Sequence, residues 1–156
     1  MEYRLESGRL SDYLQESRYV DCNHPAIQQE AGRLFAGCTN DLEKILLAFT
    51  FVRDEIPHSG DIHSSRVTRT ASEALRFREG ICYAKSMLLA ALLRSAGIPV
   101  QLQRTPRWME EKGCGYSLRL PPGYGAAAVE QLKQSGIPFS RLYLHRDDGG
   151  LEELKP

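Results

Sequence analysis

The spacing of apolar positions predicts two amphipathic helices in the first third of the chain. Apolar side chains between Pro25 and Gly37 fall on one helical face, with the proline suited to a first turn and the glycine to an end. From residue 41 onward, apolar residues return every three or four positions until Pro57 stops the pattern. Asn40 and Glu43 have capping-box spacing at its start. Both stretches are therefore expected to bury one face.

A short helix and a longer, more apolar one are predicted next. Thr70 and Glu73 form a second capping box in front of residues 71–78. The run 82–95 contains no Gly or Pro, and its large apolar side chains cover most of a helix circumference, which is typical of a central, buried helix. Gly97, with a proline two residues beyond it, is a stop signal.

Beyond this stop signal the pattern changes from helical to strand-like. Apolar and polar residues alternate near 98–102, 116–120 and 140–145, and one short helix is expected between the last two, at 126–135. A chain of 156 residues is long enough to bury one core. We expect a single domain over residues 1–156, with the least order at about 1–20 and 150–156.

Charge and cysteine usage narrow the class of protein. Twenty basic and twenty acidic residues leave no net charge, so no overall field favours nucleic acid or an anionic membrane as a partner. The N-terminal stretch is charged and lacks the apolar core of a signal peptide, and no run is long enough to span a bilayer. We expect a soluble, cytoplasmic protein with free thiols. No C-x-x-C pair supports a zinc or dithiol site among the four cysteines, Cys22, Cys38, Cys82 and Cys114.

Cys82 is the candidate for chemistry because of its place at the start of the central helix. Unpaired N–H groups and the positive end of the helix dipole favour thiolate over thiol there. A structural interpretation competes with this one, since free cysteine is among the most buried residue types. Helix position alone does not decide between a nucleophile and a small core residue.

Three motifs give residues 41–99 a family resemblance. T-A-S-x-x-L at 70–75 leads into G-x-C-x-x-K-S at 80–86, on a helix ended by A-G-I-P at 96–99. This arrangement resembles the transglutaminase-like superfamily, in particular its bacterial branch of small papain-fold cysteine enzymes. The resemblance implies an α+β fold in which the nucleophile helix packs on an antiparallel sheet whose strands present a histidine and then an acid. It also implies that Cys82 is the nucleophile.

The histidine and acid of that family are not found at their usual place. Arg119 stands where the histidine strand is expected, and a guanidinium has no acceptor that could take the thiol proton. His145 is the one histidine after the helix, and Asp147 would share its face if the strand continued. The upstream His58 and His63 are alternatives in a polar connection, where histidines are usually exposed and inert.

The resemblance implies an enzyme that acts on amide bonds of a peptide or protein substrate through a Cys82 thioester. The positions of the residues, and not the family pattern, make His145 the candidate base and Asp147 its candidate orienting acid. Water as acceptor would make the enzyme a hydrolase, and an amine would make it an acyltransferase. No cofactor or metal is expected. Two alternatives stay open: a binding or scaffold domain that lacks a working histidine–acid pair, and a rearranged domain in which the fold survives without its site.

Overall fold

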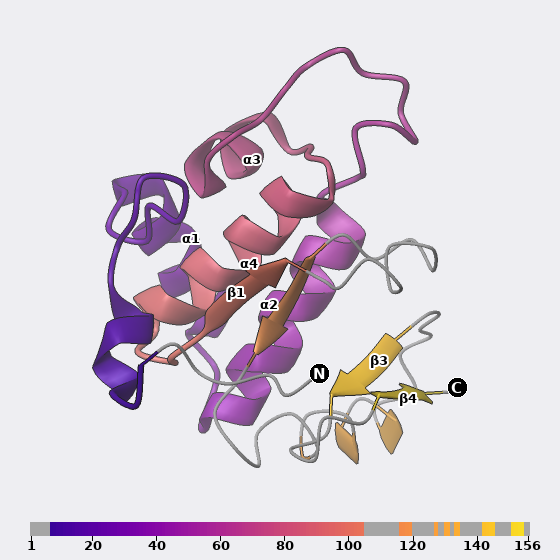
Figure 1. The fold of residues 1–156 in the computed structure, drawn as a ribbon. Coiled ribbons are helices and arrows are strands. Elements are labelled where there is room, and N and C mark those ends of the chain that lie inside the picture. The colour runs from indigo at the N-terminus through magenta and orange to yellow at the C-terminus, as the bar shows by residue number, and fades with distance from the viewer. Residues whose placement is uncertain are drawn as a thin grey trace.

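Helices followed by short strands make up the described part of the chain (Figure 1). The computed structural model describes residues 7–104, 116–119, 142–145 and 151–154, together with single helical positions at 127, 130, 131, 133 and 134. Within these residues a 3-10 helix, η1 (Leu10–Leu14), precedes the α-helices, which are α1 (Pro25–Phe35), α2 (Asp41–Glu55), α3 (Ala71–Phe77) and α4 (Cys82–Ser95). The strands are β1 (Gln101–Arg104), β2 (Tyr116–Arg119), β3 (Leu142–His145) and β4 (Leu151–Leu154).

Both predicted helix caps are present, one of them in altered form. At the start of α3 the box is complete, because the N–H of Glu73 donates to the Thr70 hydroxyl (3.2 Å) and the Glu73 carboxylate accepts from the N–H of Thr70 (3.3 Å). At α2 the Asn40 side chain accepts from the N–H of Glu43 (3.0 Å). The Glu43 carboxylate, however, accepts from the N–H of Thr39 (2.8 Å) and not from that of Asn40. None of the helices that the structure describes is long and apolar enough to cross a membrane.

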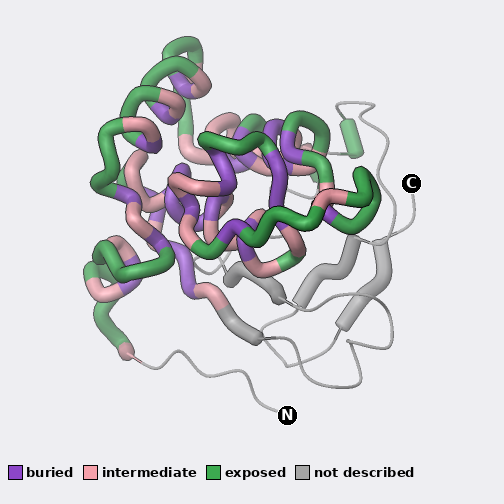
Figure 2. The backbone as a smooth tube through the Cα atoms, turned by 90° about the horizontal axis from the view of Figure 1, so that it is seen from above, coloured by how far each residue is buried: buried purple, intermediate pink, exposed green. Residues whose placement is uncertain are grey.

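Helix α4 lies in the middle of the helical part and has the bounds that the sequence predicts. It contacts α1, α2 and α3, and Figure 1 shows it running between them. Figure 2 shows the buried parts of the helices turned toward this interior. The apolar pattern on most of the α4 circumference is therefore explained by neighbours on several sides. The large apolar side chains that are less than 2 % exposed are Ile27, Ile56, Leu88, Leu92, Leu93, Ile98 and Val100.

The end of α4 is fixed by a Schellman motif. Gly97 has φ +80°, in the left-handed region that glycine adopts without strain. The N–H of Ile98 donates to the carbonyl of Leu93 and the N–H of Gly97 to that of Arg94, both at 3.0 Å. These are the two bonds that define the motif, so the predicted stop signal is confirmed.

The described strands form two separate antiparallel pairs. In β1–β2, Gln101 lies opposite Arg119, and in β3–β4, His145 lies opposite Leu151. Helix α4 contacts β1 and β2. The single sheet that the family resemblance implies is not formed by the described strands. Strand β4 was not predicted, because its sequence Leu-Glu-Glu-Leu does not alternate apolar and polar positions.

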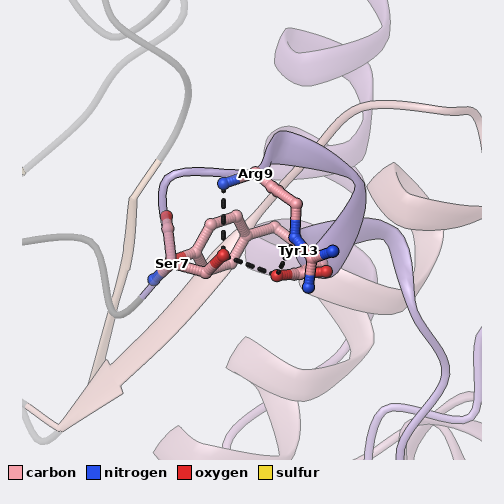
Figure 3. Close-up of polar contacts among 4 residues, drawn as sticks. Ser7, Arg9 and Tyr13 are labelled. Atoms are coloured by element: carbon pink, nitrogen blue, oxygen red, sulfur yellow. Dashed lines mark hydrogen bonds and ion pairs between the residues drawn. The ribbon is translucent and has the colours of Figure 1, made fainter.

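The N-terminal segment is attached to the end of α4 by hydrogen bonds. The Tyr13 hydroxyl accepts from the N–H of Ser7 (2.7 Å) and donates to its carbonyl (2.9 Å), which closes a small loop around η1 (Figure 3). The carbonyl of Tyr13 then accepts from the N–H of Val100 (3.1 Å). The Arg94 guanidinium donates to the carbonyls of Gln15 (2.8 Å) and Val100 (2.7 Å). Residues 7–20 therefore pack beside the C-terminal turn of α4.

A second long-range contact joins residues 19–21 to the start of α3. Asp21 accepts from the N–H of Ser72 (3.0 Å) and from its hydroxyl. The N–H of Ala71 donates to the carbonyl of Tyr19 (2.9 Å). The carboxylate sits at the positive end of α3, where helix dipoles favour negative charge. This contact holds α3, and with it the turn into α4, against the N-terminal segment.

Candidate functional site

Cys82 lies at the exposed first turn of α4. The helical hydrogen bonds begin there, where the N–H of Lys85 donates to the carbonyl of Ile81 (3.0 Å). Among the described residues, no side chain caps this end of the helix. The thiol therefore shares the helix end with backbone N–H groups and with the positive end of the dipole. Such an end can stabilise negative charge on a sulfur or an oxygen.

Gly80 fixes the approach of the chain to Cys82. Its N–H donates to the carbonyl of Pro57 (3.2 Å), its carbonyl accepts from the N–H of Ser59 (3.1 Å), and it forms a parallel bridge with His58. A Cβ at residue 80 would lie 3.0 Å from the Ala84 Cβ. The φ of Gly80 is not positive. Glycine is therefore needed here because the backbone lies close to Ala84, and not because of its backbone conformation.

Lys85 and Ser86 lie one turn after Cys82, on the same side of α4. The Ser86 hydroxyl donates to the carbonyl of Cys82 (2.9 Å). Lys85 is half-buried, and this burial lowers the pKa of its ammonium group, although the charges of Asp61 and Asp54 act in the opposite direction. The ammonium group of Lys85 is therefore partly desolvated, one turn away from the candidate nucleophile. It interacts with Asp54 near the end of α2 and with Asp61 in the connection that follows.

Three histidines are described with their side chains, and their surroundings differ. His24 caps α1, since its ring accepts from the N–H of Ala26 (3.1 Å). His63 is exposed, with φ +52°. His58 is half-buried, and its Nδ1 accepts from the N–H of Gly60 (3.1 Å). The Nδ1 acceptor of His58 is thus used within its own loop.

The predicted base and acid lie where the structure describes little or nothing of their side chains. His145 is the last residue of β3, and only its backbone position is described. Asp147 lies outside the described residues. Arg119 ends β2. The described residues therefore bring Gly80 and the 57–60 backbone close to Cys82, and the roles of His145 and Asp147 stay predictions.

The two other described cysteines differ from Cys82. Cys22 is buried, and burial is the main cause that raises the pKa of its thiol, followed by the charge of Glu16. Burial and then Glu43 raise the pKa of Cys38. A protonated thiol is a poor nucleophile, so neither residue competes with Cys82. No group of three or more metal-ligating side chains occurs in the described part of the chain, around Cys22 or elsewhere.

Sequence reasoning missed Glu79, which lies three residues before Cys82. It looks like one more charge at the end of a helix, yet its side chain is only 10 % exposed. Its Oε1 lies 3.1 Å from the Nε of Arg66, and the Thr68 hydroxyl donates to its carbonyl (3.3 Å). No local pattern could have found this contact, because Arg66 lies before α3 and Glu79 after it, and only the fold of the segment between them brings the two side chains together.

Comparison with known proteins places this arrangement in a family. The model of the transglutaminase-like superfamily matches residues 28–138, which is more than half of the chain. A solved structure from Cytophaga hutchinsonii, that of a candidate cysteine protease, is similar with a TM-score of 0.53 and 25 % sequence identity. The match covers 62 % of this chain and 32 % of that one, so the present chain spans about a third of the length of the solved protein. No curated protein sequence gives a match. The chain belongs to the transglutaminase-like superfamily.

Proposed function

We propose that this chain is a cysteine enzyme that breaks amide bonds with Cys82 as nucleophile. The observation that carries the proposal is the position of the thiol, exposed at the uncapped first turn of the buried central helix. The membership of the chain in a family of cysteine enzymes supports the same assignment. Peptides or proteins are the proposed substrates, in line with the protease description of the similar structure.

The proposed reaction has two steps that balance in atoms and charge. The Cys82 sulfur attacks the amide carbonyl, the C–N bond breaks, and the amine leaves with a proton supplied by a general acid. The resulting thioester is then attacked by water, which gives a carboxylic acid, or by a second amine, which gives a new amide. In both cases the thiol is restored. The N–H groups at the start of α4 are suited to stabilise the oxyanion of each tetrahedral intermediate.

His145, oriented by Asp147, is the proposed proton carrier. Two observations favour it over the alternatives. Nδ1 of His58 is already used as an acceptor for Gly60. Arg119, which occupies the family's histidine position, cannot act as a base at any ordinary pH. Because the chemistry needs a free thiol, the proposal also places the protein in a reducing compartment such as the cytoplasm.

A non-catalytic scaffold is the second candidate function. It is favoured by one observation: within the described residues, no imidazole has a hydrogen bond with Cys82. A domain of this kind would keep the helix and the Gly80 turn for structural reasons, because a larger residue than glycine does not fit there. Such a scaffold domain would bind a peptide without cleaving or modifying it.

The test is turnover that depends on Cys82. A fluorescent casein substrate measures hydrolysis, and incorporation of a fluorescent primary amine into casein measures acyl transfer. The parent chain is expected to be active in one of the two assays, Cys82→Ala to be inactive, and His145→Ala to be at least about a hundredfold slower. His63→Ala, at an exposed loop position, is the matched control and should keep full activity. Equal activity of the parent and Cys82→Ala would refute the proposal and leave the scaffold function.

A further inference from the structure

The polar connection from residue 57 to residue 68, named here the 57–68 loop, is attached to the turn that begins α4. It is the long magenta arch that follows α2 in Figure 1. At one end, Pro57 and Ser59 exchange backbone hydrogen bonds with Gly80. At the other, the Thr68 hydroxyl donates to the carbonyl of Glu79. Both ends of the loop therefore meet the two residues, Glu79 and Gly80, that lead to Cys82.

A side-chain contact also holds the loop close to its second end. Arg66 extends from the loop to Glu79, with 3.1 Å between Nε and Oε1. The carbon at the centre of its guanidinium lies 3.9 Å from the centre of the Phe77 ring, at the end of α3. A guanidinium stacked on an aromatic ring and paired with a carboxylate is held by two different forces at once. Glu79, Arg66 and Phe77 form what we call the Glu79 clamp.

The loop surrounds the Glu79 carboxylate with further polar groups. A hydrogen bond from the Ser64 hydroxyl is the largest cause that lowers the pKa of this carboxyl group, and it outweighs burial, which raises it. Ser59 and Arg66 lower the pKa further. The contact with Ser59 is a loose one, because neither the Ser59 Oγ nor the Glu79 Oε2 has a well-aligned hydrogen bond. The carboxylate is thus held in its charged form by residues of the 57–68 loop.

An ion pair between exposed side chains would contribute little, but this one differs in burial and in position. Glu79 is nearly covered, so the loss of Arg66 would leave a charge with few partners, and the chain would have to move to bring water to it. Such a movement would also displace Gly80, Ile81 and Cys82, because these residues directly follow Glu79 in the chain.

We propose that Glu79 and Arg66 are positioning residues for the chemistry of Cys82. They hold the 57–68 loop against the turn that begins α4, and in this way they fix the direction in which the thiol meets its substrate and the helix N–H groups. His58, on the same loop and bridged to Gly80, is kept beside the turn by the same contact. This inference rests on the proposed role of Cys82 as nucleophile.

The test measures the reactivity of the thiol and needs no substrate. Iodoacetamide labels Cys82, and mass spectrometry of the Cys82 peptide gives its rate constant between pH 5 and pH 9. In Glu79→Gln the rate constant at pH 6–7 is expected to fall about three- to tenfold, because the turn that presents the thiol to the reagent is no longer held in place. Arg66→Met should give the same change, and the double variant no more than either single one.

The matched control is Arg94→Met, which removes a partly buried arginine at the opposite end of α4. It should lower Tm while the labelling rate of Cys82 stays within about twofold of the parent. Arg66→Lys keeps the charge but not the planar stack on Phe77, and an intermediate rate is expected. The proposal is overturned if Glu79→Gln labels like the parent across the pH range, or if the effects of the two single variants multiply in the double variant.

Labelling and turnover separate this inference from the proposed function. If the parent chain has no turnover that depends on Cys82, the proposed enzyme is refuted, while the labelling rates still decide whether the clamp positions the thiol. If turnover depends on Cys82, Glu79→Gln should lower kcat about ten- to a hundredfold with little change in KM, as expected for misplaced reacting groups. An unchanged kcat would then overturn the positioning role and leave the enzyme intact.

Discussion

Gly80 provides the sharpest stability prediction, because the structure shows what a single added methyl group would meet. In Gly80→Ala the new Cβ would lie 3.0 Å from the Ala84 Cβ and 3.2 Å from the Thr68 Oγ1. Carbon atoms prefer a separation of about 3.5–4.0 Å, so the turn would have to shift by about half an ångström. Overpacking of this kind costs about 1–3 kcal/mol. The lower entropy of the unfolded alanine chain recovers about 0.4–1 kcal/mol.

The net expectation for Gly80→Ala is therefore a loss of about 1–2 kcal/mol in the free energy of unfolding. For a chain of this length that corresponds to a Tm lower by about 2–8 °C, measured by circular dichroism or calorimetry. The labelling rate of Cys82 should change as well, since the shift moves the turn that carries it.

Gly32→Ala is the matched control, with the same chemical change inside α1. A Cβ at residue 32 has nothing within 4 Å. Alanine is the better helix former by about 0.8–1.0 kcal/mol, so this variant should be more stable than the parent and should label at the parental rate. The reasoning about close approach would be refuted if the two substitutions changed Tm in the same direction, or if Gly80→Ala left both Tm and labelling unchanged.

Three further predictions follow from single contacts. Arg94→Met should lower the unfolding free energy by about 1–3 kcal/mol in urea titrations, because the part-buried carbonyl of Val100 loses its charged donor, whereas water can replace the exposed bond to Gln15; a change below about 0.5 kcal/mol would contradict the structural role. Lys85→Met should raise Tm at pH 7, because burial opposes the charged form of this lysine. The pKa of the ammonium group is lowered in the folded state, so the charged lysine destabilises the folded state fully at neutral pH. This destabilisation disappears as the pH rises through the ordinary pKa of 10.5. The Tm difference between Lys85→Met and the parent should therefore shrink between pH 7 and pH 10.5, and a constant difference would show that packing, not charge, is responsible. Thr70→Val should cost about 1 kcal/mol through loss of the α3 cap, as thermal unfolding can verify, with no effect expected if the cap is replaced by water.

The helices could be predicted because their signals are local. The 3.6-residue apolar pattern and the capping groups at Asn40 and Thr70 act within a few residues of each other, and the structure confirms both caps. The end of the central helix at Gly97 follows in the same way from a motif that spans six residues. The position of Cys82 at the start of that helix was predicted for the same reason.

The strands and their pairing could be predicted only in part. Alternation locates β1, β2 and β3, but which strand pairs with which is decided by contacts between residues far apart in the chain. Strand β4 carries no pattern of its own and exists through its pairing with β3. The predicted roles of His145 and Asp147 depend on such pairings and on side chains outside the described residues, and they stay predictions.

By itself the sequence determined the helices, the buried character of α4 and the place of a thiol at its start, since propensity, capping and apolar periodicity act over one or two turns. That this thiol is exposed was decided by the tertiary structure. Only the tertiary structure decided what surrounds that thiol. The bridge between His58 and Gly80, the contact of Arg66 with Glu79 and the attachment of Arg94 to the N-terminal segment join residues between 13 and 79 positions apart in the chain. No periodicity records such contacts, because they depend on how the segments between them are folded.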